Sequence, residues 1–125
     1  MSALVDTSIL IDFLRGDADA LTLLEQERRA GVLLASEITR LEILAGMRAD
    51  EEDATRALLS ALSWHPVDSE IAETAGELGR RWLPSHRGID SADLAIAATA
   101  IHAGAILLTR NVKHFPMFPD LEAPY

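Results

Sequence analysis

The sequence predicts an α/β fold in which a small parallel β-sheet is flanked by helices on both faces. Three short apolar runs, over residues 2–5, 32–35 and 105–108, have the length of buried strands. Helical segments separate these runs, and alternation of strands with helices is typical of a parallel sheet. We therefore expect all the strands to end at one common edge.

One domain accounts for the whole chain, because 125 residues can bury a real core but are too few for two. We find no linker or internal repeat and expect residues 1–125 to form a single domain. Cysteine is absent, which excludes disulfides and thiolate metal sites and fits a reducing compartment. The apolar N-terminus has no basic lead-in, and Asp6 and Asp12 interrupt it. We therefore expect neither a signal peptide nor a membrane span, and predict a cytoplasmic protein.

Residues that favour helix ends mark the boundaries of the expected elements. Asp17, Ser36 and Asp68 precede helical segments as N-caps, and Gly31 and Gly104 follow such segments. The first half is expected to contain a strand over 2–5, helices over 9–15 and 18–30, a strand over 32–35 and a helix over 37–47. The second half is expected to contain a helix from about 50 to 62, an extended piece over 64–67, a helix over 69–83, a loop over 84–88, a helix from 89 to about 103, a strand over 105–108 and a last strand near Leu121.

The helix that begins at Ile89 is apolar almost all round, and Asp93 is set into it. Asp93 shares a helix face with Ile89, Ile96, Ala97 and Ala100. An ionised carboxylate buried alone is costly, so it needs a cation or a shell of hydrogen bonds. The alternatives are that Asp93 faces solvent or is a core acid satisfied by hydrogen bonds.

A second carboxylate, Glu42, interrupts an apolar helix stripe formed by Ile38, Leu41 and Ala45. The alternative is a flanking position from which Glu42 reaches solvent. A third acid, Asp6, follows the first strand directly, where ligands bind in open α/β sheets. Asp6 is equally suited to a cap or turn.

The carboxyl ends of parallel strands bring these acids together. Asn111 follows the last strong strand as Asp6 follows the first, so both are expected at the same sheet edge as Glu42 and Asp93. Three carboxylates without a cation would repel one another, and Mg²⁺ or Mn²⁺ resolves that conflict because hard ions prefer oxygen ligands. Such a site suits metal-assisted hydrolysis of a phosphodiester.

Four motifs carry a resemblance to a known family: VDTSILIDFLRG at 5–16, SEITRLEILAG at 36–46, DSADLAIAATA at 90–100 and LLTRNVKHF at 107–115. In this order and spacing they resemble the PIN-domain ribonucleases, specifically the VapC toxins of bacterial toxin–antitoxin pairs. The resemblance implies a PIN fold, a Mg²⁺-dependent endoribonuclease acting on RNA, and inhibition by a VapB-like antitoxin. It also implies a homodimer that forms a heterotetramer or larger assembly with the antitoxin.

The resemblance also implies roles for individual residues. Asp6, Glu42 and Asp93 match the acidic metal-binding positions, and Asn111 matches a fourth position where the family has Asp or Asn. An Asn is a neutral ligand, so both a one-metal and a two-metal site stay open. Asp90 lies one helical turn before Asp93 and is either an additional acid of the site or the helix N-cap.

Thr7 and Thr109 match polar positions beside the acids, where they could orient carboxylates or water. Capping of the first helix, for which Thr7 and Ser8 are the candidates, explains Thr7 without any role in the site. The four histidines show no metal-ligand spacing, so surface or loop positions are expected for all of them: His65, His86, His102 and His114. Phe115, after the last motif, is expected in the core.

The formal net charge of −9 argues against nucleic acid, but a metal site concentrates acids that bound cations would offset. Ten of the eleven basic residues are Arg, which suits bidentate phosphate contacts and is equally explained by genome composition. Five basic residues are expected near the acidic edge as RNA contacts, the alternative for each being an ordinary solvated charge: Arg15, Arg40, Arg87, Arg110 and Lys113.

Two rival functions fit the residues less well. A phosphotransfer domain fits poorly, because Ser8 stands where a dehalogenase-type phosphatase has its second Asp and no Asp directly follows the run over 32–35. A catalytically silent PIN-like module for protein binding has no reason to bear the cost of clustered carboxylates. Apolar residues in the helices over 50–62 and 69–83 are expected in the core first, and in an antitoxin groove or dimer interface second: Leu58, Leu59, Leu62, Leu78, Trp82 and Leu83.

Overall fold

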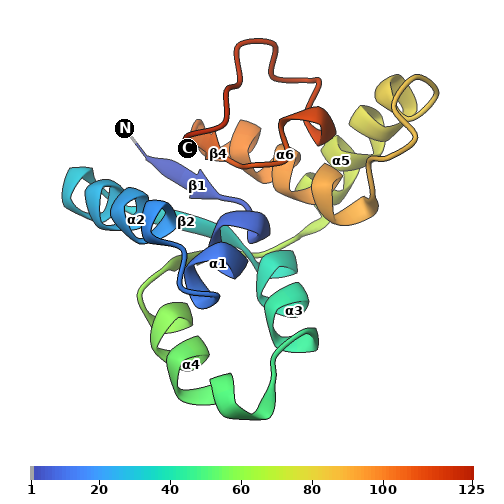
Figure 1. Cartoon of the computed structure of the whole chain (residues 1–125). Coiled ribbons are helices and arrows are strands. Elements are labelled where there is room, and N and C mark those ends of the chain that lie inside the picture. The colour runs from blue at the N-terminus through green and yellow to red at the C-terminus, as the bar shows by residue number, and fades with distance from the viewer. Residues whose placement is uncertain (1) are drawn as a thin grey trace.

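The computed structural model describes residues 2–125, in which four parallel strands form one sheet between layers of helices (Figure 1). This confirms the predicted α/β fold; Met1 of the predicted domain lies outside the described residues. The strands are β1 (Ala3–Val5), β2 (Leu33–Ser36), β3 (Ser63–His65) and β4 (Ile106–Leu108). The helices are α1 (Thr7–Leu14), α2 (Ala18–Ala30), α3 (Glu37–Ala45), α4 (Glu52–Ser60), α5 (Ser69–Trp82) and α6 (Ser91–Ala103), with short 3-10 helices η1 (Ala49–Glu51) and η2 (Val112–His114).

The strand order β3-β2-β1-β4 creates the edge at which a site can form. From β1 the chain moves outward on one side to β2 and β3, and then returns to add β4 on the other side of β1. The order therefore reverses at β1, and ligands in open α/β sheets bind outside the carboxyl ends of the strands at such a point. Pairing of Val5 with Leu108 brings the residues after β1 and β4 side by side.

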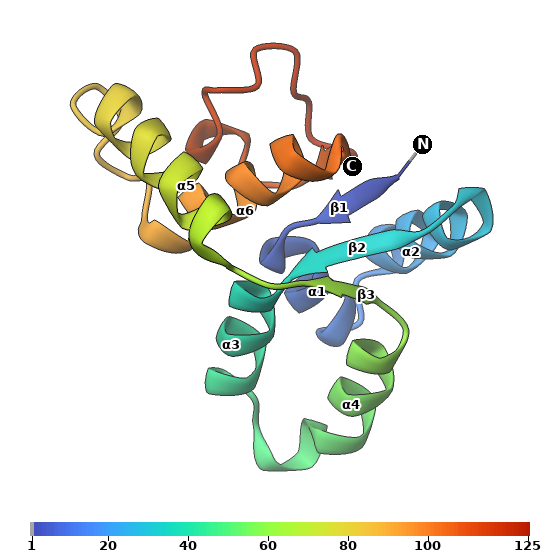
Figure 2. The same ribbon diagram turned by 180° about the vertical axis from the view of Figure 1, so that it is seen from behind.

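Alternating side chains of the strands build two apolar cores, one on each face of the sheet. Leu4, Leu34 and Leu107 face α6, which packs Ile96, Ala97 and Ala100 against them together with Phe115. Their neighbours in the strands face the opposite layer, where α1, α2 and α4 supply apolar side chains. Figure 2 shows the two layers from behind, with α5 and α6 on one side and α2 and α4 on the other.

Helix α6 is central in this arrangement, because every residue from Asp93 to Ala100 is buried. The prediction of a helix that is apolar almost all round is therefore confirmed. It ends at Gly104, whose φ of 60° is in the left-handed region that glycine adopts without steric cost.

Two details of the sequence prediction are wrong. The predicted buried stripe of α3 is displaced: Leu41 is 60% exposed and Ala45 is exposed, whereas Thr39 and Ile43 are buried. The cause is that the buried Thr39 hydroxyl hydrogen-bonds to Thr7. A polar residue therefore occupies a buried position that a hydrophobicity pattern assigns to its apolar neighbours. The predicted strand near Leu121 is also absent: among residues 2–125 no strand follows β4.

The segment after β4 forms turns because its prolines lack the amide hydrogen that a strand pairing needs. Leu121 packs on the core beside Phe115, as do Met117 and Phe118. Element boundaries otherwise differ by a few residues: α1 begins at Thr7, α3 ends at Ala45, and η1 precedes α4.

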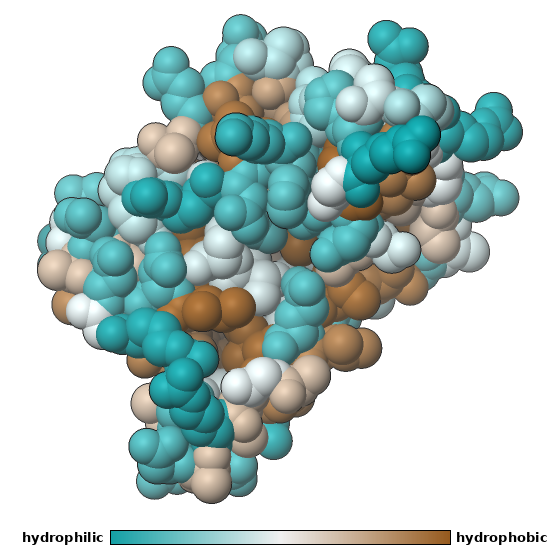
Figure 3. Space-filling view, turned by 45° about the vertical axis from the view of Figure 1, so that its right-hand side comes forward, coloured by the Kyte–Doolittle hydropathy of each residue, from teal (hydrophilic) through white to brown (hydrophobic). Residues whose placement is uncertain are grey.

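The surface in Figure 3 carries apolar patches between hydrophilic side chains. Leu58, Leu59 and Leu62 are buried as predicted, while Leu83 is 38% exposed. Over residues 2–125 no helix combines the length and apolar character that crossing a membrane requires.

Candidate active site

A cavity of about 330 Å³ lies outside the carboxyl ends of β1 and β4. The residues around it come from the starts of α1 and α6, from α3 and from the segment after β4. All five predicted catalytic residues line it, together with residues that the sequence did not single out. The lining residues are Asp6, Thr7, Ser8, Ile11, Asp12, Glu42, Asp90, Asp93, Asn111 and His114.

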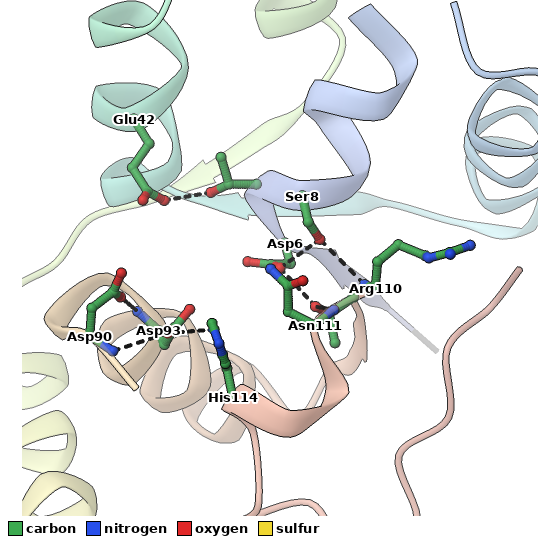
Figure 4. Close-up of polar contacts among 10 residues, drawn as sticks. Asp6, Ser8, Glu42, Asp90, Asp93, Arg110, Asn111 and His114 are labelled. Atoms are coloured by element: carbon green, nitrogen blue, oxygen red, sulfur yellow. Dashed lines mark hydrogen bonds and ion pairs between the residues drawn. The ribbon is translucent and has the colours of Figure 1, made fainter. Parts of the chain in front are cut away.

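Asp6 is fixed by two hydroxyl groups rather than by the backbone (Figure 4). It occupies the N-cap position of α1, as the alternative interpretation allowed, but its side chain makes no capping hydrogen bond. Instead Asp6 Oδ2 accepts hydrogen bonds from Ser8 Oγ at 2.8 Å and from Thr109 Oγ1 at 2.7 Å. Because Thr109 lies on the neighbouring strand end, the sheet register itself orients this carboxylate. The predicted position of Thr109 beside an acid agrees with this contact.

Glu42 is held by a buried pair of threonines. Thr7 Oγ1 lies 2.7 Å from Glu42 Oε1 and 3.0 Å from Thr39 Oγ1. A hydroxyl carries one hydrogen, so Thr7 donates to the carboxylate and accepts from Thr39. Thr7 is therefore a positioning residue for Glu42 and does not cap α1. Thr39, which is fully buried, was missed in the sequence because nothing distinguishes it from a helix-surface threonine.

Asp90 and Asp93 bond each other's backbone in a capping box at the start of α6. Asp90 Oδ1 accepts from the Asp93 amide at 2.8 Å, and Asp93 Oδ2 accepts from the Asp90 amide at 3.1 Å. Asp90 is thus the N-cap that the sequence allowed, and it lines the cavity as well. Asp93 is 8% exposed, so it is neither a surface residue nor a carboxylate without partners.

Burial raises the pKa of Asp93 from 3.8 to about 6. Two contacts lower this pKa: the hydrogen bond from the Asp90 backbone and the nearby His114. The negative charges of Asp90 and Asp6 raise it further. Asp93 therefore carries a charge at neutral pH that its surroundings disfavour.

His114 and Ser8, like Thr39, make contacts in this site that the sequence did not predict. His114 Nδ1 lies 3.1 Å from Asp93 Oδ2, and Figure 4 shows its ring pointing toward that carboxylate. The expectation of an ordinary loop position for His114 is therefore wrong. The sequence signal that could have identified His114 was its position three residues after Asn111, in a short helical turn. For Ser8 the signal was its position two residues after Asp6, within reach of that side chain.

Two of the predicted RNA contacts are paired within the chain on the α3 side of the cavity. Arg15 forms an ion pair with Glu51. Arg40 pairs with Glu37, its Nε lying 2.5 Å from Oε1, and its guanidinium lies 4.2 Å from the ring centre of Trp64. Both are committed to contacts that compete with phosphate binding.

The other three predicted contacts lie on the opposite side, toward α6 and the chain end. Arg110 bonds the backbone oxygen of Tyr125 and lies over its ring at 4.5 Å, and Figure 4 shows its side chain extending away from the carboxylates. Arg87 and Lys113 are exposed, and within residues 2–125 neither forms an ion pair. None of the five lines the cavity.

The donor set of the cavity fits a hard divalent cation. Asp6 Oδ1, Glu42 Oε2 and Asp93 Oδ1 have no hydrogen-bond partner among residues 2–125, and no side-chain oxygen or nitrogen in this part of the chain is both buried and unpartnered. Each carboxylate is thus fixed by one oxygen and has the other available to a ligand. In the described residues no group of three or more His, Cys, Asp or Glu side chains is close enough together to hold a metal ion as it stands, so the metal assignment to Asp6, Glu42 and Asp93 stays a prediction.

Comparison with known proteins gives a consistent family. The sequence matches the PIN domain family over residues 3–117. It is 51% identical over 123 residues to Ribonuclease VapC19 of Mycobacterium tuberculosis, covering 98% of both chains. Ribonuclease VapC10 of the same organism is 39% identical over 122 residues, which cover 98% of this chain and 92% of that protein. A chain in a toxin–antitoxin complex from Klebsiella pneumoniae is 32% identical and matches the fold with a TM-score of 0.82 over 98% of both chains.

Proposed function

This chain belongs to the PIN-domain family, and we propose that it is a toxin of the VapC type, an endoribonuclease that hydrolyses RNA phosphodiester bonds at the acidic cavity. One observation carries the proposal. Three carboxylates converge on one cavity, each is fixed through a single oxygen, and Asp93 carries a charge that burial disfavours. A catalytically silent module would gain nothing from this cost.

We propose Mg²⁺, with Mn²⁺ as a substitute, as the cofactor, and Asp6, Glu42 and Asp93 as the residues that would hold it. All available donors are oxygens, which these ions prefer. When bound, a divalent cation supplies Lewis-acid activation of water and offsets the charge of the phosphate. Asn111 adds a neutral amide oxygen, so we expect one ion rather than two.

The chain's own residues contribute orientation. The hydroxyls of Ser8 and Thr109 hold Asp6, the Thr7 hydroxyl holds Glu42, and the start of α6 holds Asp93. Outer partners of this kind fix the direction of metal-binding side chains, and their loss typically costs 10- to 100-fold in affinity or activity.

We further propose that the partner of this chain is a VapB-like antitoxin and that the chain acts in the cytoplasm, where RNA is available. A single PIN domain and a homodimer within a larger complex remain predictions.

An apolar cavity of about 420 Å³ between α2 and α4, with Phe13, Leu24, Ala57 and Leu58 among its lining residues, suits an antitoxin helix. Ala57→Glu places a charge in this cavity and should weaken antitoxin binding measured by calorimetry; an unchanged affinity would put the antitoxin elsewhere.

The test is cleavage of total cellular RNA by the wild type and Asp93→Asn, in Mg²⁺ and then in EDTA. Asp120→Asn makes the same chemical change at an exposed position and serves as the matched control. We expect discrete fragments from the wild type and the control in Mg²⁺ only. Equal cleavage by Asp93→Asn would refute the site, and no cleavage by folded, antitoxin-free wild type would refute the enzyme function.

A further inference from the structure

The charge of this acidic chain is distributed very unevenly. Residues 78–119 contain five of the 11 basic residues and only two of the 20 acids, Asp90 and Asp93, which both line the cavity. The excess of acids therefore lies entirely in the rest of the chain. Residues 78–119 comprise the end of α5, the turn that follows, α6, β4 and η2.

This basic part of the chain is also one region in space. Figures 1 and 2 show its yellow-to-red elements gathered on one side of the sheet, with the blue-to-green helices α1 to α4 on the other. A polyanion that approaches the cavity meets repulsion over α1 to α4 and over the first turns of α5, which carry Glu70, Glu73 and Glu77, and attraction along residues 78–119.

The densest basic stretch on that side is residues 80–87, with the sequence RRWLPSHR. Arg80, Arg81 and Arg87 are exposed, and none of them forms an ion pair within residues 2–125. This contrasts with Arg15 and Arg40, which are both paired with glutamates. Unpaired arginines remain available for phosphate oxygens.

The stretch also presents an aromatic surface. The Arg81 guanidinium lies 5.1 Å from the ring centre of the half-buried Trp82, and His86 meets that ring edge-on at 5.6 Å. Arginines interleaved with aromatic rings bind single-stranded nucleic acids, since phosphates contact the cations and unpaired bases stack on the rings.

The stretch leads directly into the cavity. Two residues after Arg87 the chain reaches Ile89, and then Asp90 in the cavity wall. A Cβ at Gly88 would lie 3.9 Å from Nε2 of His114, so the end of the turn adjoins a second cavity residue. A strand of RNA with one phosphate at the carboxylates can thus continue along this turn.

We propose that residues 80–87 form a track for the single-stranded RNA that flanks the scissile phosphate, with Arg80, Arg81 and Arg87 on its phosphates and Trp82 beneath a base. The proposal rests on the RNA-cleaving function proposed above and specifies how its substrate is bound. It excludes the α1–α4 side as the RNA path.

The chain supplies a matched pair of variants for the test. Arg80 and Arg81 are adjacent exposed residues in the last turn of α5, and Arg28 and Arg29 are adjacent exposed residues in the last turn of α2, on the acidic side. Both double substitutions to Gln remove the same charge and the same interaction with a helix C-terminus. Only the first pair lies on the proposed track.

Binding of a fluorescein-labelled 20-nucleotide single-stranded RNA of mixed sequence is measured by anisotropy in EDTA at several NaCl concentrations. Loss of two phosphate contacts should reduce the slope of log affinity against log salt by about 1.4, or about 25-fold in affinity at 0.1 M salt. Arg28→Gln with Arg29→Gln should keep the wild-type slope. Equal slopes for both pairs, whether reduced or unchanged, would overturn the track.

Cleavage assays separate this outcome from the proposed function. Substitution of Arg80 and Arg81 should raise KM for long RNA and leave kcat unchanged, because these residues do not touch the reacting phosphate. Cleavage by the wild type with equal salt slopes refutes the track alone. The expected difference in slopes without any cleavage supports the track and refutes the catalytic function. Loss of antitoxin binding with an unchanged RNA slope would assign the stretch to the protein partner and overturn the proposal.

Discussion

Replacing Asp93 by Asn should make the metal-free protein more stable at neutral pH. Burial and the neighbouring acids raise the pKa of Asp93 from 3.8 to about 6. The folded chain therefore holds this proton more tightly than the unfolded chain, and the free energy of unfolding decreases as the pH rises from about 4 to 6. Above that window the cost of the ionised carboxylate reaches about 3 kcal/mol.

Asn keeps the shape of the side chain and can still accept the hydrogen bond from the Asp90 amide. It gives up the favourable interaction with His114, so we expect a net gain of roughly 1–3 kcal/mol at pH 7.5, which raises Tm by about 3–10 °C. Thermal unfolding in EDTA between pH 4 and 8 measures this. The gain should fade toward pH 4, and Asp120→Asn should show no such pH dependence. A variant less stable than the wild type by the same amount at every pH would refute the reasoning.

The wild type and Asp93→Asn also show whether the ionised Asp93, which destabilises the metal-free protein, binds the metal ion. A ligand that binds only the folded state stabilises it by about 2.7 kcal/mol at 100 times its Kd. Addition of Mg²⁺ should therefore raise the Tm of the wild type and leave that of Asp93→Asn almost unchanged, so the stability order approaches equality or reverses. A Mg²⁺ shift of equal size in both proteins would show that Asp93 does not bind the ion.

Three further outcomes follow from single contacts. Thr7→Val should reduce kcat about 10- to 100-fold by releasing Glu42, and Thr7→Ser, which keeps the hydroxyl, should restore it; equal activity of Val and Ser variants would contradict the positioning role. Gly104→Ala should cost about 1–2 kcal/mol in urea unfolding through its left-handed φ alone, since the added Cβ meets no atom within 4 Å; a neutral effect would argue against that conformation. Phe115→Ala should cost about 3–5 kcal/mol, because the ring is 1% exposed in the core beneath α6, and a loss below 1 kcal/mol would be inconsistent with that burial.

The fold was largely predictable because its strands and helix ends carry strong local signals. Asp17, Ser36 and Asp68 each accept the backbone hydrogen bond expected of an N-cap. The strand near Leu121 was not predictable in this way, because an apolar residue between prolines packs on the core without strand pairing. In this segment the apolar side chain of Leu121 indicates that the residue packs on the core, but it does not indicate the backbone conformation.

The site was predictable in its acids and less so in what holds them. Asp6 and Asp93 stood out because an acid at a strand end or in an apolar helix needs an explanation. The hydroxyl of Thr39 and the ring of His114 did not, since their roles depend on partners 32 and 21 positions away in the sequence. Glu42 was identified although its stripe was assigned one position off, because the motif and the stripe were independent arguments.

The alternatives for Asp90 and Asp93, helix cap or metal site, turn out not to exclude each other. Each carboxylate uses one oxygen for the capping box, and the positive end of the α6 dipole favours negative charge at this position. Hydroxyls hold Asp6 and Glu42, and among residues 2–125 no Arg or Lys lines the cavity. Apart from His114 beside Asp93, neutral donors orient the carboxylates without neutralising them. The negative charge is therefore left for a ligand from outside the chain, which is the condition that a cation site requires.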